Sequence, residues 1–134
     1  MAKKRMTVPA VRINNETWAI VPDTLVYDAG EGEIKVEAVS IGGGKSESIH
    51  GEDISTAIGM VKFDVPTTDD LDAKIREMKQ AIGANGIVFV EKIGSQIVKR
   101  TFTGMSLSNS VERNVGSDGK VSLEFKGDPM EGAQ

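Results

Sequence analysis

The sequence predicts a mainly β protein in which two antiparallel sheets pack as a β-sandwich or barrel, with one α-helix alongside. Three observations lead to this prediction. Apolar and polar residues alternate over short segments, glycine- or asparagine-rich turns separate these segments, and only one segment has the spacing of an amphipathic helix. With 134 residues, 39% of them hydrophobic, the chain can bury one core, so we expect a single domain over 1–134.

Two strands joined by a tight turn open the predicted fold. Residues 8–13 and 17–21 flank Asn14 and Asn15, and asparagine tolerates the positive φ that a two-residue hairpin turn requires. Before them, we expect the basic start of the chain to be a flexible arm.

The middle of the chain carries two further predicted strands. Residues 34–41 alternate apolar and charged side chains, and residues 60–65 form a strand that Pro66 ends. Between them, three successive glycines predict a mobile loop over 42–48. Residues 49–57 have a mixed pattern and are expected to be irregular or a short edge strand.

The helix is predicted over residues 68–83. Thr68 is expected to cap its start, and Gly83 to close its end. Apolar residues recur every three or four positions, which places them on one buried face: Leu71, Ile75, Met78 and Ile82.

The last third of the chain is expected to be β structure. Residues 87–92 and 96–103 form a predicted hairpin with Gly94 and Ser95 at its turn. Residues 105–112 then alternate between an apolar face and a polar face. A turn at 116–119 leads into a strand at 121–125, and residues 127–134 are expected to be a loose tail.

Composition and charge exclude several classes of function. Zero cysteines and one histidine rule out disulfides, thiolate metal sites, cysteine nucleophiles and a multi-histidine zinc site within one chain. The first fifteen residues carry four basic and no acidic side chains, so the remainder has a net charge of −8, against −4 for the whole. An acidic body disfavours tight nucleic-acid binding. Apolar runs are too short to span a membrane, and no signal-peptide core follows the start, so we expect synthesis in a cytoplasm.

Three patterns are weighed as chemical sites. Gly44-Lys45-Ser46 resembles the end of a phosphate-binding loop, but position 39, where that loop needs glycine, is Val, and no helical pattern follows. A flexible surface loop is therefore favoured over nucleotide binding.

The other two patterns are equally incomplete. Ser48 and His50, followed by Glu52 and Asp53, supply the residue types of a hydrolytic triad without its sharp nucleophile turn. Acidic residues at 28, 31 and 33 lack the spacing of a calcium loop. We therefore expect no enzymatic activity, no cofactor and no metal.

The order of segments resembles the tail tube proteins of long-tailed bacteriophages, including contractile-tailed ones, a family related in fold to pyocin and type VI secretion tubes. Each segment alone is ordinary strand-and-turn sequence, but the series spans nearly the whole chain. The segments that carry the resemblance are 13–18, 21–25, 39–45, 61–68, 100–105 and 116–129.

The resemblance implies a structural virion protein that forms hexameric rings stacked into a tube. The implied partners are a tape-measure protein inside the tube, a baseplate and, in contractile tails, a sheath. Genomic DNA would pass through the bore during ejection into the host, and assembly would take place in the host cytoplasm. Loops and termini contact neighbouring rings in such tubes, so the implied ring-stacking loop is Gly42, Gly43, Gly44, Lys45 and Ser46.

Small polar and acidic side chains suit the wall of a bore that DNA traverses. The candidate luminal row is the polar face of the predicted strand 105–112, namely Ser106, Ser108, Ser110 and Glu112. Two other functions remain open at this point: a monomeric β-sandwich binding module that uses loop 42–48, and, less favoured, a small hydrolase or nucleotide-binding enzyme.

Overall fold

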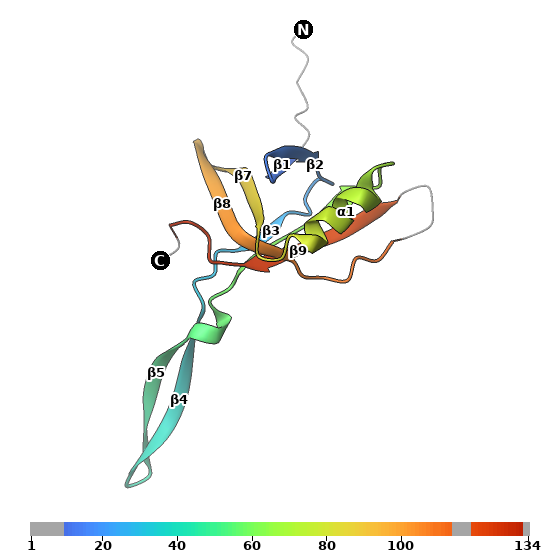
Figure 1. The fold of residues 1–134 in the computed structure, drawn as a ribbon. Coiled ribbons are helices and arrows are strands. Elements are labelled where there is room, and N and C mark those ends of the chain that lie inside the picture. The colour runs from blue at the N-terminus through green and yellow to red at the C-terminus, as the bar shows by residue number, and fades with distance from the viewer. Residues whose placement is uncertain (1–9, 114–118, 133–134) are drawn as a thin grey trace.

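The computed structural model describes residues 10–113 and 119–132. The described residues form nine strands, one short 3-10 turn and one α-helix (Figure 1). In chain order these are β1 (Ala10–Ile13), β2 (Glu16–Ala19), β3 (Val26–Asp28), β4 (Glu33–Gly42), β5 (Lys45–Asp53), η1 (Ile54–Thr56), β6 (Gly59–Pro66), α1 (Leu71–Gln80), β7 (Asn85–Ile93), β8 (Gln96–Leu107) and β9 (Lys120–Gly127). The predicted fold class, mainly antiparallel β with one helix, is confirmed. The basic start at 1–9 and most of the predicted turn at 116–119 lie outside the described residues.

Seven strands form one sheet in the order β2-β1-β7-β8-β9-β6-β3, and β4 and β5 form a second sheet of two strands. Strand β8 takes part in both halves of the large sheet. Its residues 96–105 pair with β7, whereas Ser106 and Leu107 pair with β9. We call β2-β1-β7-β8 the first half-sheet and β8-β9-β6-β3 the second half-sheet. The two halves share one hydrophobic core.

Glycines allow the close approach of β8 and β9 at the junction of the two half-sheets. Gly104 has a φ of +63°, and a Cβ there would lie 2.3 Å from a carboxylate oxygen of Asp128. A Cβ on Gly127 would lie 2.2 Å from the carbonyl oxygen of Gly104. Only glycine fits at both positions without a shift of the backbone or of Asp128.

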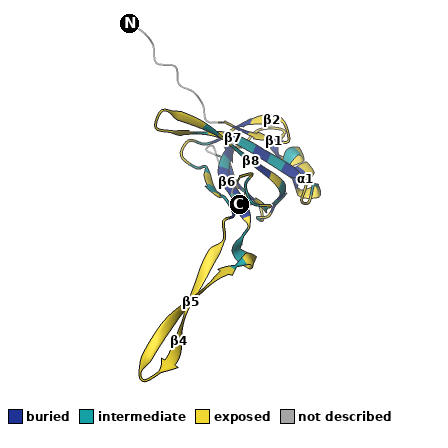
Figure 2. Cartoon of the chain, turned by 90° about the vertical axis from the view of Figure 1, so that its left-hand side faces the viewer, coloured by how far each residue is buried: buried dark blue, intermediate teal, exposed yellow. Residues whose placement is uncertain are grey.

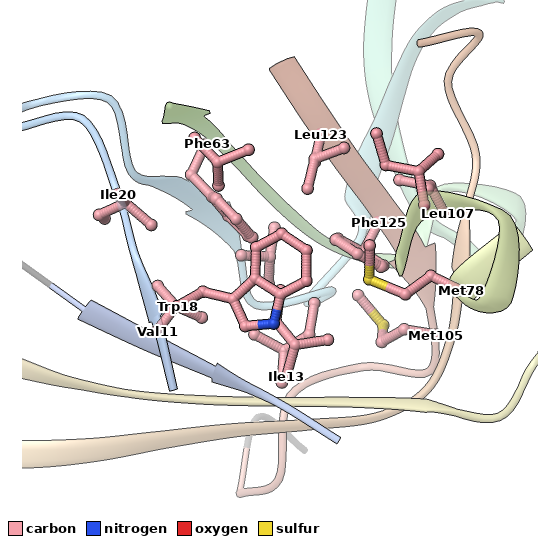
Figure 3. Close-up of a cluster of buried hydrophobic side chains, with 14 of the residues drawn as sticks. Val11, Ile13, Trp18, Ile20, Phe63, Met78, Met105, Leu107, Leu123 and Phe125 are labelled. Atoms are coloured by element: carbon pink, nitrogen blue, oxygen red, sulfur yellow. The ribbon is translucent and has the colours of Figure 1, made fainter. Parts of the chain in front are cut away.

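The core lies between the half-sheets and is closed by α1. Figure 3 shows the Trp18 indole in the middle of this cluster, and the rings of Phe63 and Phe125 stack with centroids 6.0 Å apart. Asn85 is the one fully buried polar side chain in the described core, and its amide nitrogen donates to the carbonyl oxygens of Met78 and Met105. These bonds tie the end of the helix to the sheet.

The helix begins later than the sequence predicts. Its N-cap position is Asp70, and the Thr68 hydroxyl donates to the Asp70 carboxylate at 2.8 Å instead of capping the helix. The prediction of a Thr68 cap is therefore wrong. Leu71, Ile75 and Met78 are buried, as the apolar spacing predicts.

The helix also ends earlier than predicted. It stops at Gln80, and Gly83 follows with a φ of +67°. Ile82 lies beyond the last helical turn and is 82% exposed, so its predicted place on the buried face is wrong.

Both predicted hairpin turns are confirmed. Asn14 and Asn15 have φ values of 53° and 69°, and Gly94 has a φ of 60°. These conformations bring β1 against β2 and β7 against β8, in agreement with the sequence prediction.

The C-terminal segment differs from the loose tail that the sequence predicts. Beyond the end of β9, the Met130 amide donates to the Ala29 carbonyl at 2.8 Å, and the Glu131 amide donates to the Thr101 carbonyl at 3.0 Å. Met130 also packs against the core. The loose-tail prediction is wrong for residues 127–132, and residues 133–134 lie outside the described chain.

Candidate functional site

The most distinctive surface is the β4–β5 hairpin, residues 33–53, which we call the hairpin arm. It projects away from the rest of the chain (Figure 1), and Figure 2 shows both of its strands as exposed. Every residue of β4 is exposed, as is every residue of β5 except Asp53. Of the two alternatives expected for 49–57, the strand is observed for residues 49–53, because β5 continues through 45–53 as a full partner of β4.

Among the described residues, the hydrogen bonds that join the arm to the body lie at its base. The Glu33 amide donates to the Thr56 hydroxyl at 2.6 Å, which joins the start of β4 to η1. Asp53 caps η1, since its carboxylate accepts hydrogen bonds from the Ser55 amide at 3.2 Å and the Ser55 hydroxyl at 2.5 Å. These bonds fix where the arm leaves the body.

The three glycines form the tip of the arm. Gly42 pairs with Lys45, and Gly42, Gly43 and Gly44 all have positive φ values. Lys45 and Ser46 belong to β5, so the predicted mobile loop 42–48 is reduced to this tip. A strand follows Ser46 where a phosphate-binding loop needs a helix. The ring-stacking role of Gly42 to Ser46 is not tested by this geometry and stays a prediction.

The two faces of the arm differ in charge. Residues paired across an antiparallel ladder point to the same side, and the register therefore assigns each side chain to a face. The acidic face carries four carboxylates, one lysine and two large apolar residues: Glu33, Lys35, Glu37, Val39, Glu47, Ile49, Gly51 and Asp53. The neutral face carries one carboxylate: Ile34, Val36, Ala38, Ser40, Ser46, Ser48, His50 and Glu52.

Large apolar side chains on the arm have no cover from the described chain. Ile34 is 67% exposed, and Val36 and Ile49 are 56% and 54% exposed. Complete burial of such a side chain contributes about 1.5–3 kcal/mol, and an isolated two-stranded hairpin is only marginally stable in water. An arm with these side chains gains stability when a second surface covers it.

Three of the four residues weighed as a hydrolytic triad share one face of the arm. Ser48, His50 and Glu52 share the exposed neutral face, whereas Asp53 lies on the acidic face and bonds Ser55. Among the acidic residues weighed as cation ligands, the Asp28 carboxylate accepts a hydrogen bond from the Gly30 amide at 2.9 Å. No group of three or more metal-ligating side chains occurs within residues 10–113 and 119–132.

The candidate luminal row does not form one strand face. Strand β8 ends at Leu107, so only Ser106 of the row lies in a strand, and Ser108, Ser110 and Glu112 follow in irregular chain. The Ser106 hydroxyl accepts a hydrogen bond from the Gly83 amide, and the Ser108 hydroxyl donates to the Glu124 carbonyl at 3.1 Å. The predicted strand over 105–112 is thus wrong beyond 107, while the luminal role stays a prediction.

A polar cluster without any local sequence signal joins the two half-sheets. The Tyr27 hydroxyl donates to a Glu91 carboxylate oxygen at 2.6 Å, and Arg100 Nε donates to the same oxygen at 3.0 Å. These hydrogen bonds, the one from Tyr27 above all, hold the pKa of Glu91 below its ordinary value, and the bond to Glu91 raises the pKa of Tyr27. The partners are 64 residues apart, so no local motif could reveal them.

Comparison with known proteins assigns this chain to no family. No protein-family model matches the sequence, and no curated protein matches it. Among solved structures, the chain is similar to one in the "Cryo-EM structure of the anti-feeding prophage (AFP) baseplate, 6-fold symmetrised". The two chains are 13% identical with a TM-score of 0.48, over 98% of this chain and 96% of the other. Within the described residues, no helix has the length and hydropathy needed to cross a membrane.

Proposed function

We propose that this protein is a structural subunit that assembles with copies of itself, and that the hairpin arm makes the contact. The observation that carries the proposal is the exposure of the arm along its whole length, including Ile34, Val36 and Ile49. Ile34 and Val36 are neighbours on the neutral face and Ile49 lies on the acidic face, so both faces of the arm carry exposed apolar surface, which is typical of a binding surface. Strands β2 and β3, at the two edges of the large sheet, are only four and three residues long, which limits edge pairing as the main contact.

We further propose that the assembly is a phage tail tube built from stacked hexameric rings. The support is the sequence resemblance together with an arm suited to reach a neighbouring copy. The proposed partners are the tape-measure protein, the baseplate and, in a contractile tail, the sheath. In this role the protein belongs to the virion, conducts DNA during ejection and needs no catalytic activity.

Sedimentation velocity of the purified chain over a wide concentration range tests self-assembly. We expect the sedimentation coefficient to rise with concentration toward that of a ring or tube. A matched variant removes residues 36–50 and joins Lys35 to Gly51 through Asn-Gly, because these two residues face each other across the arm. This variant should fold and remain monomeric. A full-length chain that stays monomeric throughout would refute the proposal, as would an armless variant that assembles normally.

The luminal row is tested by Ser108→Arg in assembled particles. If Ser108 lines the bore, each ring gains six positive charges that pair with phosphates, so DNA ejection slows, most at low salt. Ser108→Ala is the matched control, because it removes the hydrogen bond to the Glu124 carbonyl without adding charge. Normal tails with unchanged ejection in the arginine variant would contradict the luminal assignment.

A further inference from the structure

The outward face of the first half-sheet is positively charged and apolar. The register places Arg12 beside Val88, Val90 beside Lys99, and Lys92 beside Ile97, all on the side away from the core. We call these six residues the basic face. Val90 is 60% exposed and Ile97 is 73% exposed, and the three cationic side chains are exposed as well.

The basic face has no acidic partner within its own strands. The outward positions of β1, β2, β7 and β8 include no carboxylate, because Glu16 and Glu91 both lie on the inner side. Within residues 10–113 and 119–132, no ion pair involves Arg12, Lys92 or Lys99.

The second half-sheet is different on its outward side. There, three lysines alternate with three carboxylates: Lys62, Lys120, Lys126, Asp28, Asp64 and Glu124. Lys126 and Glu124 pair at 3.3 Å, and the Ser122 hydroxyl donates to Asp64 at 2.5 Å. The outward side of the second half-sheet therefore has no net charge. Of the two outward sheet surfaces, the basic face is the one that attracts an acidic partner.

We propose that the acidic face of the arm of one copy docks on the basic face of the next copy. The acidic face has a net charge of −3 (four carboxylates and Lys35), and the basic face has a net charge of +3. Complementary potentials of this kind steer association and set its register. Val39 and Ile49 form the apolar part of the acidic face, and Val90 and Ile97 form the apolar part of the basic face. In the proposed contact these two apolar parts pack against each other.

One copy cannot join these two surfaces within itself. The arm points away from β7 and β8 in both views (Figures 1 and 2). Contact therefore requires a second copy. Because the two surfaces differ, the contact is heterologous, and repeating it builds a closed ring or an open filament instead of a simple dimer.

This inference rests on the proposed self-assembly and adds which surfaces meet. Charge reversal tests it. One variant carries Glu37→Lys and Glu47→Lys on the arm, and a second carries Lys92→Glu and Lys99→Glu on the sheet. Each should raise the concentration for half-assembly about tenfold or more, because like charges then face each other. All four side chains are exposed, so Trp18 fluorescence should report an unchanged fold.

Mixing the two variants gives the decisive result. The reversed arm of the first variant then fits the reversed sheet of the second, and the unchanged arm of the second fits the unchanged sheet of the first. An equimolar mixture should therefore regain assembly that neither variant has alone. Glu52→Lys on the neutral face and Arg76→Glu on α1 are matched controls that should assemble within about twofold of the original chain.

The outcomes separate this inference from the proposed function. If the unaltered chain never assembles, the proposed function fails, and the docking inference fails with it. If the unaltered chain assembles but the reversed variants assemble equally well, self-assembly stands and the docking inference is overturned. It is also overturned if the reversed variants fail to assemble and mixing does not restore them, because the arm then binds a different surface.

Discussion

Replacement of Ile75 by alanine tests the helix face with an internal control. Ile75 is 4% exposed on α1, whereas Ile82, just beyond the helix, is 82% exposed. The change removes three carbon atoms, and about 0.8 kcal/mol for each buried carbon gives about 2.4 kcal/mol. A residual cavity adds to this cost, while the higher helix propensity of alanine offsets about 0.4 kcal/mol. Ile75→Ala should therefore cost about 2–3 kcal/mol, and Ile82→Ala less than about 0.5 kcal/mol.

Urea unfolding followed by Trp18 fluorescence measures both changes. Trp18 is the single tryptophan and is 9% exposed in the core, so its emission reports whether the core is intact. The measurement belongs at concentrations below those of assembly, since assembly would stabilise the folded subunit by mass action. Equal costs at the two positions would refute the placement of the helix end at Gln80. A negligible cost at Ile75 would refute the packing of α1 on the sheet.

Three further predictions follow from particular residues. Gly104→Ala should destabilise the subunit by at least about 1–2 kcal/mol, because its φ is +63° and a Cβ meets Asp128, whereas Gly51→Ala on the open arm should be nearly neutral in the same urea assay. The pKa of Glu91 is lowered on folding, so its carboxylate stabilises the fold above its ordinary pKa and loses that contribution as pH falls through the lowered value. Glu91→Gln should therefore show a shallower loss of stability on acidification, and an unchanged pH profile would contradict the role of this carboxylate. Deletion of residues 43–44 should leave the body folded but weaken assembly. If this variant sediments like the unaltered chain at every concentration, the arm tip takes no part in the contact.

The sequence predicts the helix face from side chains divided between core and solvent, and the burial of Leu71, Ile75 and Met78 confirms it. The hairpin turns at Asn14 and Gly94 carry a different signal, residues that accept a positive φ, and they are confirmed as well. Burial on one face imposes the alternation that the prediction relies on.

The mistakes arise where that signal is absent. Strand β5 has solvent on both faces, so residues 45–53 show no apolar alternation, and only their pairing with β4 makes them a strand. Ile82 continues the helical spacing by coincidence, because the chain has already left the helix at Gln80. The segment 128–132 is held by backbone hydrogen bonds to residues far away in the sequence, which composition does not encode.

The sequence locates the proposed contact surface only in part. It singles out the glycines at 42–44 as a ring-stacking loop; the structure places them at the tip of the projecting arm, and their role in stacking stays a prediction. The charge difference between the two faces of the arm depends on the register of β4 against β5. The basic face depends likewise on the pairing of β1, β7 and β8. Neither surface can be assembled from sequence before these pairings are known.

Electron microscopy of the purified chain tests the central claim most directly. We expect rings with six-fold symmetry, alone or stacked into tubes, in which the arm of each subunit lies against the outward face of β7 and β8 of its neighbour. Monomers at every concentration would contradict self-assembly, and rings whose arms extend freely into solvent would contradict the role of the arm as the contact that builds them.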